Sequence, residues 1–298
     1  MARAPQEQKA GAGSFEEIRP HLFAIAYRML GSTADAEDMV QEAFLRYRKA
    51  EAVEHERAYL SKVVTRLCID HLRSARVRRE SYVGPWLPEP LLTEAAPDVA
   101  EEAARSDSLS MAFLVMLETL SPVERAVFLL RDVFGYEYSE VGKMVGKSAD
   151  NCRQIAHRAR EHIEARRPRF QAEKAKRDEL FGAFFIACAQ GDLEALKGIL
   201  TEDATLWSDG GGKARAARRP IEGRAKVARF LLGILAKEKN DLTVQVAEVN
   251  GQHGFIVFDG DRPGTVASLE FDDHAISGVR LVVNPDKLTH LAVPPSSR

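Results

Sequence analysis

Four prolines within a short span divide this sequence into separate folding units. Pro85, Pro88, Pro90 and Pro97 fall between residues 80 and 107, among small and acidic residues. Proline lacks a backbone N–H and its ring clashes with the preceding helical turn, so this span cannot form a continuous helix. Residues with helical periodicity lie on both sides of it. We therefore interpret residues 80–107 as a linker between two helical domains.

The rest of the chain divides into three predicted domains and two short tails. Apolar residues recur with helical period over residues 14–79 and 108–168, and Pro20 and Gly31 are predicted to separate the first helix from the second. From residue 169 to 292, helical segments give way to Gly-rich turns and β-branched runs. Residues 1–13 and 293–298 are predicted tails. We expect a multidomain protein with two all-α domains followed by an α+β domain.

Composition narrows the class of protein. The chain has 45% hydrophobic and 29% charged residues and a net charge of -2, so a basic nucleic-acid-binding surface has to be local. Cys68, Cys152 and Cys188 are far apart and lack the spacing of a metal site or disulfide framework. No apolar run approaches the roughly 20 residues of a membrane span, and no secretory signal is present. These features predict a soluble cytoplasmic protein with no metal or cofactor.

Two helices of the first block carry opposite charge. Ser32 can cap a helix with Ala36 and Val40 on one face and acidic residues on another, a pattern that by itself is best explained as a solvated surface. The next helix places basic residues opposite Leu60 and Val64, namely Lys62, Arg66, Arg73 and Arg76. A cationic ridge of this kind suits phosphate binding, because neutralised phosphates release counterions.

The second helical block has the pattern of a helix-turn-helix. Ser121 followed by Pro122 and Glu124 predicts a helix start. A short apolar helix then ends at Gly146, and Ser148 caps a second helix up to about residue 165. Its predicted outward residues can contact bases or phosphates in a major groove: Asn151, Arg153, Gln154, His157, Arg158 and Arg160. An ordinary helical hairpin with a charged exterior is the alternative.

The order of these features resembles an extracytoplasmic-function sigma factor of the sigma-70 family over about residues 14–168. Residues 36–44 are similar to region 2.2, which implies that Asp38, Gln41 and Glu42 contact core RNA polymerase. Residues 59–73 are similar to regions 2.3 and 2.4, and residues 121–160 to region 4. The resemblance implies contacts with the minus-ten promoter element from Tyr59, Lys62, Arg66, Asp70, Arg73 and Arg76. It implies minus-thirty-five contacts from Ser148, Asn151, Arg153, Gln154, His157, Arg158 and Arg160.

Three further strings resemble a subgroup whose separate anti-sigma protein is replaced by a fused SnoaL-like domain. These strings supply the candidate regulatory residues between domains, which are Trp86, Pro88, Glu89, Pro90, Asp209, Gly210, Gly211, Gly212, Lys213, Asn284, Pro285, Asp286, Lys287 and Leu288. The resemblance implies a nuclear-transport-factor-2-like cone around a pocket that a small molecule can enter. It also implies regulation within the chain, with no separate anti-sigma protein required.

Two other functions remain open at this point. A one-component regulator would join a helix-turn-helix to a ligand-binding domain, but it has no need of the acidic helix at Asp38 to Phe44. A SnoaL-type cyclase or isomerase would draw its acid–base groups from Asp209, His253, Asp259, Asp261 and His274. No motif brings two of these residues together and fold analogy does not establish chemistry. We therefore predict that the chain is not an enzyme and has no catalytic residues.

Overall fold

The computed structural model describes residues 7–50, 53–80, 82–93, 106–164, 173–237 and 242–291, and the side chains of 7–13, 75–80, 106 and 107 are outside this description. The chain forms two compact units. The first contains residues 1–78, 96–109 and 113–166, and the second contains residues 79–95, 110–112 and 167–298. The first part of the proline-rich linker therefore belongs to the same unit as the C-terminal domain.

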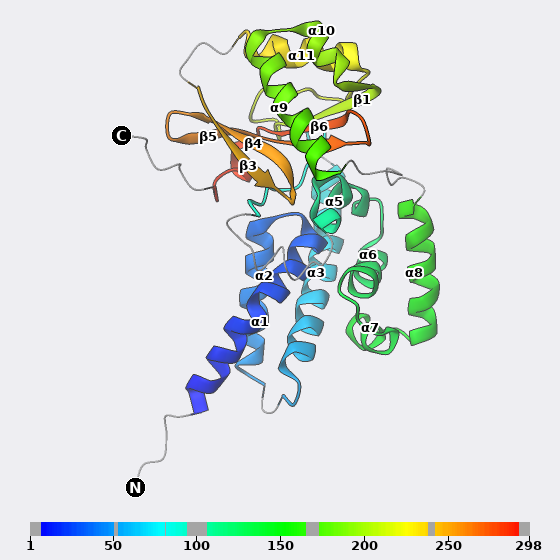
Figure 1. Ribbon diagram of the computed structural model, residues 1–298. Helices are drawn as coiled ribbons and strands as arrows, with labels where there is room; N and C mark the ends of the chain where they lie inside the picture. The colour runs from blue at the N-terminus through cyan, green and yellow to red at the C-terminus, as the bar shows by residue number, and fades with distance from the viewer. Residues whose placement is uncertain are drawn as a thin grey trace. The chain divides into compact units, whose positions relative to one another are not determined.

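The first unit begins with three helices, α1 (Glu7–Leu30), α2 (Thr33–Tyr47) and α3 (Glu56–Glu80) (Figure 1). Helix α1 begins before residue 14, and it continues through Pro20 and ends at Gly31, which has φ 66°. The expectation that Pro20 separates two helices is therefore wrong. Burial of almost every residue from Leu22 to Leu30 explains the continuity, because tertiary packing overrides local propensity.

The same unit continues with η1 (Ser106–Leu109), α5 (Met111–Leu117), α6 (Pro122–Phe128), the π-turn η2 (Leu129–Val133), α7 (Tyr138–Val145) and α8 (Ala149–Glu164). The predicted start of α6 is confirmed by a capping box between Ser121 and Glu124. The predicted turn is confirmed too, since Gly146 adopts φ 72° and the backbone N–H of Asn151 donates to Ser148 Oγ at 3.2 Å. Helices α7 and α8 form the predicted helix-turn-helix.

The second unit contains α9 (Lys174–Gln190), α10 (Leu193–Gly198), α11 (Arg224–Leu235) and a six-stranded sheet (Figure 1). The strands are β1 (Leu200–Asp209), β2 (Ile221–Glu222), β3 (Leu242–Val249), β4 (Gln252–Asp259), β5 (Arg262–Phe271) and β6 (Ile276–Val282), followed by η3 (Pro285–Lys287). Their order in the sheet is β2-β1-β6-β5-β4-β3, and only β1 and β6 pair in parallel. The predicted α+β domain is confirmed.

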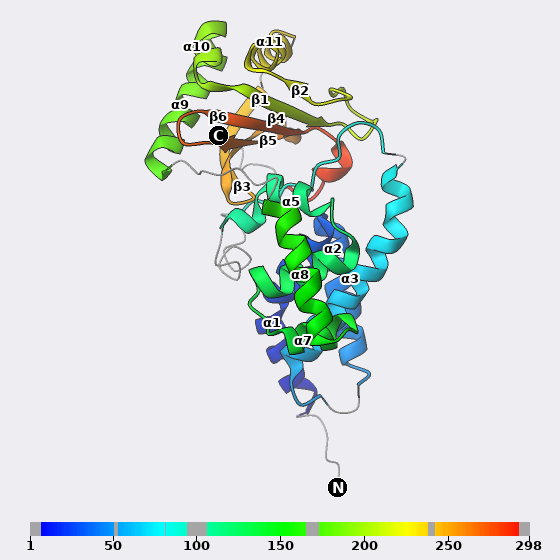
Figure 2. The ribbon, with the colours of Figure 1, turned by 90° about the vertical axis from the view of Figure 1, so that its right-hand side faces the viewer.

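Both faces of this sheet contain buried residues, although the edge strand β3 is largely exposed. The three helices lie against one face (Figure 2), where side chains of Leu206, Leu269 and Val279 join those of Phe184 and Leu231 in one apolar core. On the other face, alternate residues such as Ile256 and Val266 are also buried. Linker residues 82–93 run along that side (Figures 1 and 2).

Candidate functional site

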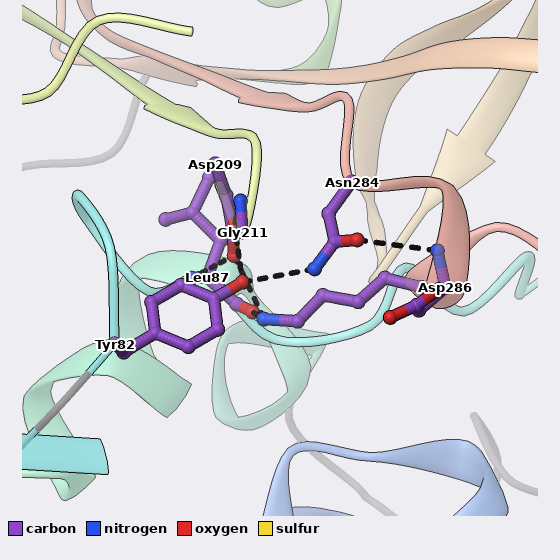
Figure 3. Close-up of polar contacts among 7 residues, drawn as sticks. Tyr82, Leu87, Asp209, Gly211, Asn284 and Asp286 are labelled. Atoms are coloured by element: carbon purple, nitrogen blue, oxygen red, sulfur yellow. Dashed lines mark hydrogen bonds and ion pairs between the residues drawn. The ribbon is translucent and has the colours of Figure 1, made fainter. Parts of the chain in front are cut away.

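A single buried carboxylate holds the linker on the C-terminal domain. Asp209, the last residue of β1, is completely buried and accepts four hydrogen bonds (Figure 3). Its Oδ1 accepts from the Tyr82 hydroxyl at 2.5 Å and from the Gly211 backbone N–H at 3.1 Å. Its Oδ2 accepts from the Leu87 backbone N–H at 2.8 Å and from Lys287 Nζ at 2.7 Å. Four donors compensate for the loss of water around the charge.

Lys287 completes this cluster from the C-terminal turn η3. Besides Asp209, its ammonium group donates to the backbone carbonyl of Leu87. It also lies 4.5 Å from the ring centroid of Trp86 and 5.1 Å from that of Tyr82, within cation–π range. Burial, followed by the hydrogen bond to Asp209, raises the pKa of Tyr82, so its hydroxyl stays a donor. Lys287 thus contacts the linker through a hydrogen bond from its ammonium group and through cation–π contacts with two aromatic rings.

Asn284, which precedes the C-terminal turn η3, approaches Gly211 so closely that only glycine fits at position 211. Gly211 has φ 57°, a left-handed conformation that glycine adopts without cost. A Cβ at this position would overlap the side-chain amide of Asn284 and come within 3.0 Å of the Tyr82 hydroxyl. Asn284 Nδ2 donates to that hydroxyl at 3.0 Å, and Asn284 Oδ1 accepts from the Asp286 N–H at 3.2 Å to cap η3 (Figure 3).

The linker is held a second time at the end of the edge strand β3. Leu91 and Asn250 exchange hydrogen bonds of 3.0 and 2.8 Å, the first of them to the Asn250 side chain. The backbone N–H of Thr93 donates to the carbonyl of Glu248 at 3.1 Å, and its hydroxyl donates to the Glu248 carboxylate at 2.5 Å. His290 adds a 2.7 Å contact to the carbonyl of Pro90. The linker therefore extends the sheet by a short bridged segment.

The structure brings the three predicted regulatory strings together, though unevenly. Trp86, Asp209, Gly211, Asn284 and Lys287 meet in the cluster around the carboxylate. The predicted residues Pro88, Pro90 and Leu288 are buried nearby in sequence, and Glu89 is half-buried. Lys213 and Asp286 instead form an ion pair with each other at the surface. Leu87 and Leu91 belong to the first string, whereas sequence reasoning missed several contacting residues, which are Tyr82, Thr93, Glu248, Asn250 and His290.

In the first unit, the acidic helix α2 presents its predicted polymerase residues outward. Asp38 and Gln41 are exposed, and Glu42 is partly exposed with its carboxylate 2.8 Å from Arg46 Nε. Leu45, one turn after Gln41, keeps half of its surface exposed.

The basic helix α3 does not leave all its predicted DNA residues open to solvent. Arg66 donates from Nε to the Met144 carbonyl at 2.8 Å and from a terminal nitrogen to the Lys143 carbonyl at 3.2 Å, both in the last turn of α7. Arg73 pairs with Asp70 at 3.2 Å, and both are largely exposed. Tyr59 and Lys62 are half-buried, and the side chain of Arg76 lies outside the described residues.

Further polar contacts join the two helical blocks within the first unit. The Tyr136 hydroxyl donates to Ser61 Oγ at 2.9 Å and lies 2.7 Å from His21 Nε2. Arg125 is buried and donates to the Met29 carbonyl at 2.6 Å. With Arg66, these contacts pack the helix-turn-helix block against the N-terminal helices.

Helix α8 carries the exposed polar face that the sequence predicts, with one exception. Asn151, Arg153, Gln154, His157 and Arg158 are exposed, while Cys152, Ile155, Ala159 and Ile163 are buried. Arg160 is only partly exposed, because its guanidinium donates twice to Asp132, at 2.9 and 2.7 Å, and once to Tyr138 at 3.0 Å. Arg160 therefore ties α8 to the preceding helices, contrary to its predicted outward position.

The acid–base candidates do not assemble into a catalytic group. Asp209 is enclosed by the linker, and His253 pairs with Asp178 of α9. Asp261 and His274 lie exposed in separate turns of the sheet, and Asp259 ends β4. Within the described residues, no group of three or more histidine, cysteine or acidic side chains is placed to hold a metal ion. No described helix is long and apolar enough to span a membrane.

The chain thus has a helical domain with an acidic and a basic helix, followed by a linker and a helix-turn-helix, and family models of sigma-70 proteins match both helical parts. Residues 15–78 match the family model of Sigma-70 region 2, and residues 110–163 match that of Sigma-70, region 4. The chain is 37% identical over 290 residues to the ECF RNA polymerase sigma factor SigJ of Mycobacterium tuberculosis, covering 92% of each chain. It is 34% identical over 280 residues to the probable ECF sigma factor SigI of that species, covering 92% of this chain and 93% of SigI.

Solved structures agree with the sequence comparison. The crystal structure of M. tuberculosis SigJ superimposes with a TM-score of 0.76 at 34% identity, covering 93% of this chain and 98% of SigJ, and thus includes the C-terminal domain. The chain belongs to the extracytoplasmic-function RNA polymerase sigma factors. It therefore binds core RNA polymerase and promoter DNA and directs promoter-specific transcription initiation. The comparisons therefore support a sigma factor, which is not an enzyme, over the alternatives of a one-component regulator and a SnoaL-type enzyme.

Proposed function

We propose that the C-terminal domain regulates this sigma factor within the same chain by holding the linker between the two promoter-binding domains. The observation that carries the proposal is the attachment of residues 82–93 to the sheet domain, through Asp209 and Lys287 at one end and β3 at the other. Most of these contacts use backbone groups of the linker, so they depend on the path of the linker as well as on its side chains.

Linker reach gives this attachment a physical consequence. The minus-ten and minus-thirty-five elements are centred about 25 base pairs apart, roughly 85 Å at 3.4 Å per base pair. Fully extended at about 3.4 Å per residue, residues 81–105 reach at most ~85 Å, whereas the residues beyond Thr93 reach only ~40 Å. Holding residues 82–93 therefore fixes the path of about half of this segment, so that only the residues beyond Thr93 remain free to change the separation of the two domains. Release or retention of the linker changes which promoter geometries the protein can bind.

Individual residues are assigned roles within this function. Asp38, Gln41 and Glu42 contact core polymerase from the outer surface of α2. Tyr59, Lys62, Arg66, Asp70, Arg73 and Arg76 contact the minus-ten element, and the exposed residues of α8 with Ser148 contact the minus-thirty-five element. Exposure of Arg153, Gln154 and Arg158 on the second helix of a helix-turn-helix supports the latter assignment. Arg160 acts there by positioning α8.

The proposal has three corollaries. Because the regulator is part of the chain, no separate anti-sigma protein is required. A small molecule that enters the C-terminal domain can act as the signal. The site of action is the cytoplasm, where RNA polymerase transcribes.

Transcription in vitro tests the regulatory role directly. Full-length protein and core polymerase would be assayed on a pooled promoter library, with core alone as the blank and Asp209→Asn as the linker-releasing variant. Asp286→Asn, which breaks only the exposed pair with Lys213, is the matched control. We expect sequence-selective initiation by the native chain and a several-fold change in the dose–response curve for Asp209→Asn alone. An increase means that the attachment restrains initiation, and a decrease means that it supports it. Superimposable curves for a variant with a verified loss of linker contact would contradict the proposal.

A further inference from the structure

The C-terminal domain contains an apolar cavity of about 470 Å³ that the linker contacts do not use. It lies between helices α9 and α11 and the outer strands of the sheet. Phe184, Phe185 and Phe255 form an aromatic wall, and Leu231 and Ile234 of α11 form the aliphatic wall opposite. A volume of this size falls within the range of about 300–1,000 Å³ that is typical of sites for small organic ligands.

We infer that this cavity binds an uncharged, largely apolar small molecule that carries a hydrogen-bond donor. The inference rests on the proposed function, because it specifies the chemistry of the signal that the regulatory domain would receive. Aromatic rings offer flat contact area at little cost in side-chain entropy, so the wall of three phenylalanines favours a flat or ring-containing ligand.

Polar groups at the cavity define the ligand further. Asp259 at the end of β4 is the one charged side chain among the described lining residues, and Thr265 of the adjacent strand supplies a hydroxyl. Asp259 is exposed, so its carboxylate lies at the solvent side of the cavity. An ionised carboxylate only accepts hydrogen bonds and repels anions. A neutral ligand with a hydroxyl donor is therefore favoured over a fatty acid or another organic anion.

The entrance itself is unusually apolar. Leu235 and Val244 line the cavity while leaving 46% and 48% of their surfaces exposed. These side chains present apolar surface to an incoming molecule at the point where α11 and β3 meet the solvent. Occupation of the cavity would remove that surface from water.

Strand β3 connects the cavity to the linker. Its first residues, Leu242 and Val244, line the cavity, whereas Glu248 and Val249 at its other end hold linker residues Thr93 and Leu92. A ligand that shifts or rigidifies this edge strand therefore acts on the strand that binds the linker. The cavity is placed to pass its occupancy to the proposed regulatory contact.

Binding can be tested on the full-length protein with two fluorescent probes. Nile red is neutral and apolar, and 1-anilinonaphthalene-8-sulfonate is apolar but anionic. We expect saturable binding of Nile red at micromolar concentration and at least fivefold weaker binding of the anionic probe. Asp259→Asn should strengthen binding of the anionic probe severalfold and leave Nile red affinity within twofold of the native value.

A cavity-filling variant locates the site. Val257→Trp places a large side chain in the cavity and should weaken Nile red binding at least tenfold, with folding verified by circular dichroism and thermal melting. Val246→Trp is the matched control, because Val246 is 62% exposed on neighbouring β3 and is not a lining residue. We expect native affinity for the control.

Four outcomes would overturn the inference: absence of saturable Nile red binding, equal weakening by both tryptophan variants, preference for the anionic probe, or a dimer of the native chain that only Val257→Trp dissociates. The last outcome would assign the apolar surface to a second copy. Saturable binding of Nile red, combined with unchanged transcription by the Asp209→Asn variant, would support the ligand site and contradict the proposed regulatory function. A change in transcription for Asp209→Asn, combined with no binding of Nile red, would support the regulatory function and contradict the ligand site.

Discussion

Lys287 Nζ lies 2.7 Å from a carboxylate oxygen of Asp209, and both side chains are buried. The two residues come from the last turn of the domain and from its first strand, and both also bond to the backbone of Leu87. One ion pair therefore joins three distant parts of the chain, and its loss has consequences for the stability of this unit.

Removing either partner should destabilise the C-terminal unit strongly. We expect Asp209→Asn or Lys287→Met to lower its free energy of unfolding by about 3–5 kcal/mol, because an uncompensated charge or a buried polar group stays behind. Urea unfolding followed by tryptophan fluorescence measures this, since both tryptophans, Trp86 and Trp207, belong to this unit. Lys213→Met, at an exposed ion pair, should cost less than about 1 kcal/mol. Equal effects at the two pairs would refute this prediction.

Gly211→Ala should disturb the same cluster through the backbone. The left-handed conformation costs a non-glycine residue about 1–3 kcal/mol, and the new methyl group also displaces the Asn284 amide. The same urea transition should move to lower concentration. Gly182→Ala on α9 provides the control, because its Cβ would meet no atom within 4 Å, and alanine favours a helix by about 0.5–1 kcal/mol. A neutral Gly211→Ala would show that this turn has another conformation in solution.

Arg66→Ala should loosen the helix-turn-helix from the N-terminal helices. Its guanidinium supplies two charge-assisted hydrogen bonds to the last turn of α7, and hydrogen bonds of this type contribute about 1.5–3 kcal/mol each when buried, less at a partly exposed site. Hydrogen exchange should become at least fivefold faster in α7 and in the turn at Gly146. Arg73→Ala, which removes only the exposed pair with Asp70, should leave that exchange unchanged. Unaltered protection in both variants would contradict the contact.

Cys188 should react slowly with alkylating reagents until the solution is strongly alkaline. Burial raises the pKa of its thiol to about 11, whereas an unperturbed cysteine titrates near 8.5. Because the thiolate is the reactive form, the rate at which native Cys188 reacts with iodoacetamide should rise about tenfold per pH unit up to pH 10. In the unfolded protein, the corresponding rate should level off before that pH is reached. Cys68 and Cys152 are fully buried, so peptide mass spectrometry should find little native-state labelling at either. A plateau at Cys188 below pH 9.5 would contradict the burial.

Local signals in the sequence were enough to predict the helices and most strands. Ser121, Gly146 and Ser148 mark helix ends through short-range hydrogen bonds and backbone conformation, and the structure confirms them. The start of β1 at Leu200 has no clear local signal, because Glu202 and Asp203 interrupt the apolar alternation where the register of β1 against β6 is irregular. Pro20 was misinterpreted because its effect on the helix depends on burial of the residues that follow.

The site was only partly predictable, for a similar reason. Resemblance identified Trp86, Asp209 and Lys287, but nothing in their local sequences indicates that one carboxylate binds all three strings. Leu91 contributes backbone groups, which leave little trace in residue type, and Thr93 and Glu248 combine backbone and side-chain contacts that form only in the folded chain. Asn250-Gly251 is a turn signal visible in the sequence, yet the use of the Asn250 side chain to hold Leu91 depends on the tertiary fold. Likewise, Arg160 was predicted to point outward from helical periodicity, which cannot reveal its partner Asp132.

The separation of Leu87 from Lys287 along the chain sets an order of events during synthesis. Both promoter-binding domains are complete by about residue 164, whereas the lysine that closes over the linker is translated far later. At about 5–20 residues per second, the ribosome needs roughly 6–25 s to make the intervening segment. Every new molecule therefore passes through an interval in which its DNA-binding domains have been synthesised and its linker is not yet bound by Lys287. The rate of translation through the C-terminal domain thus sets how long each newly made chain lacks the contact between Lys287 and Leu87.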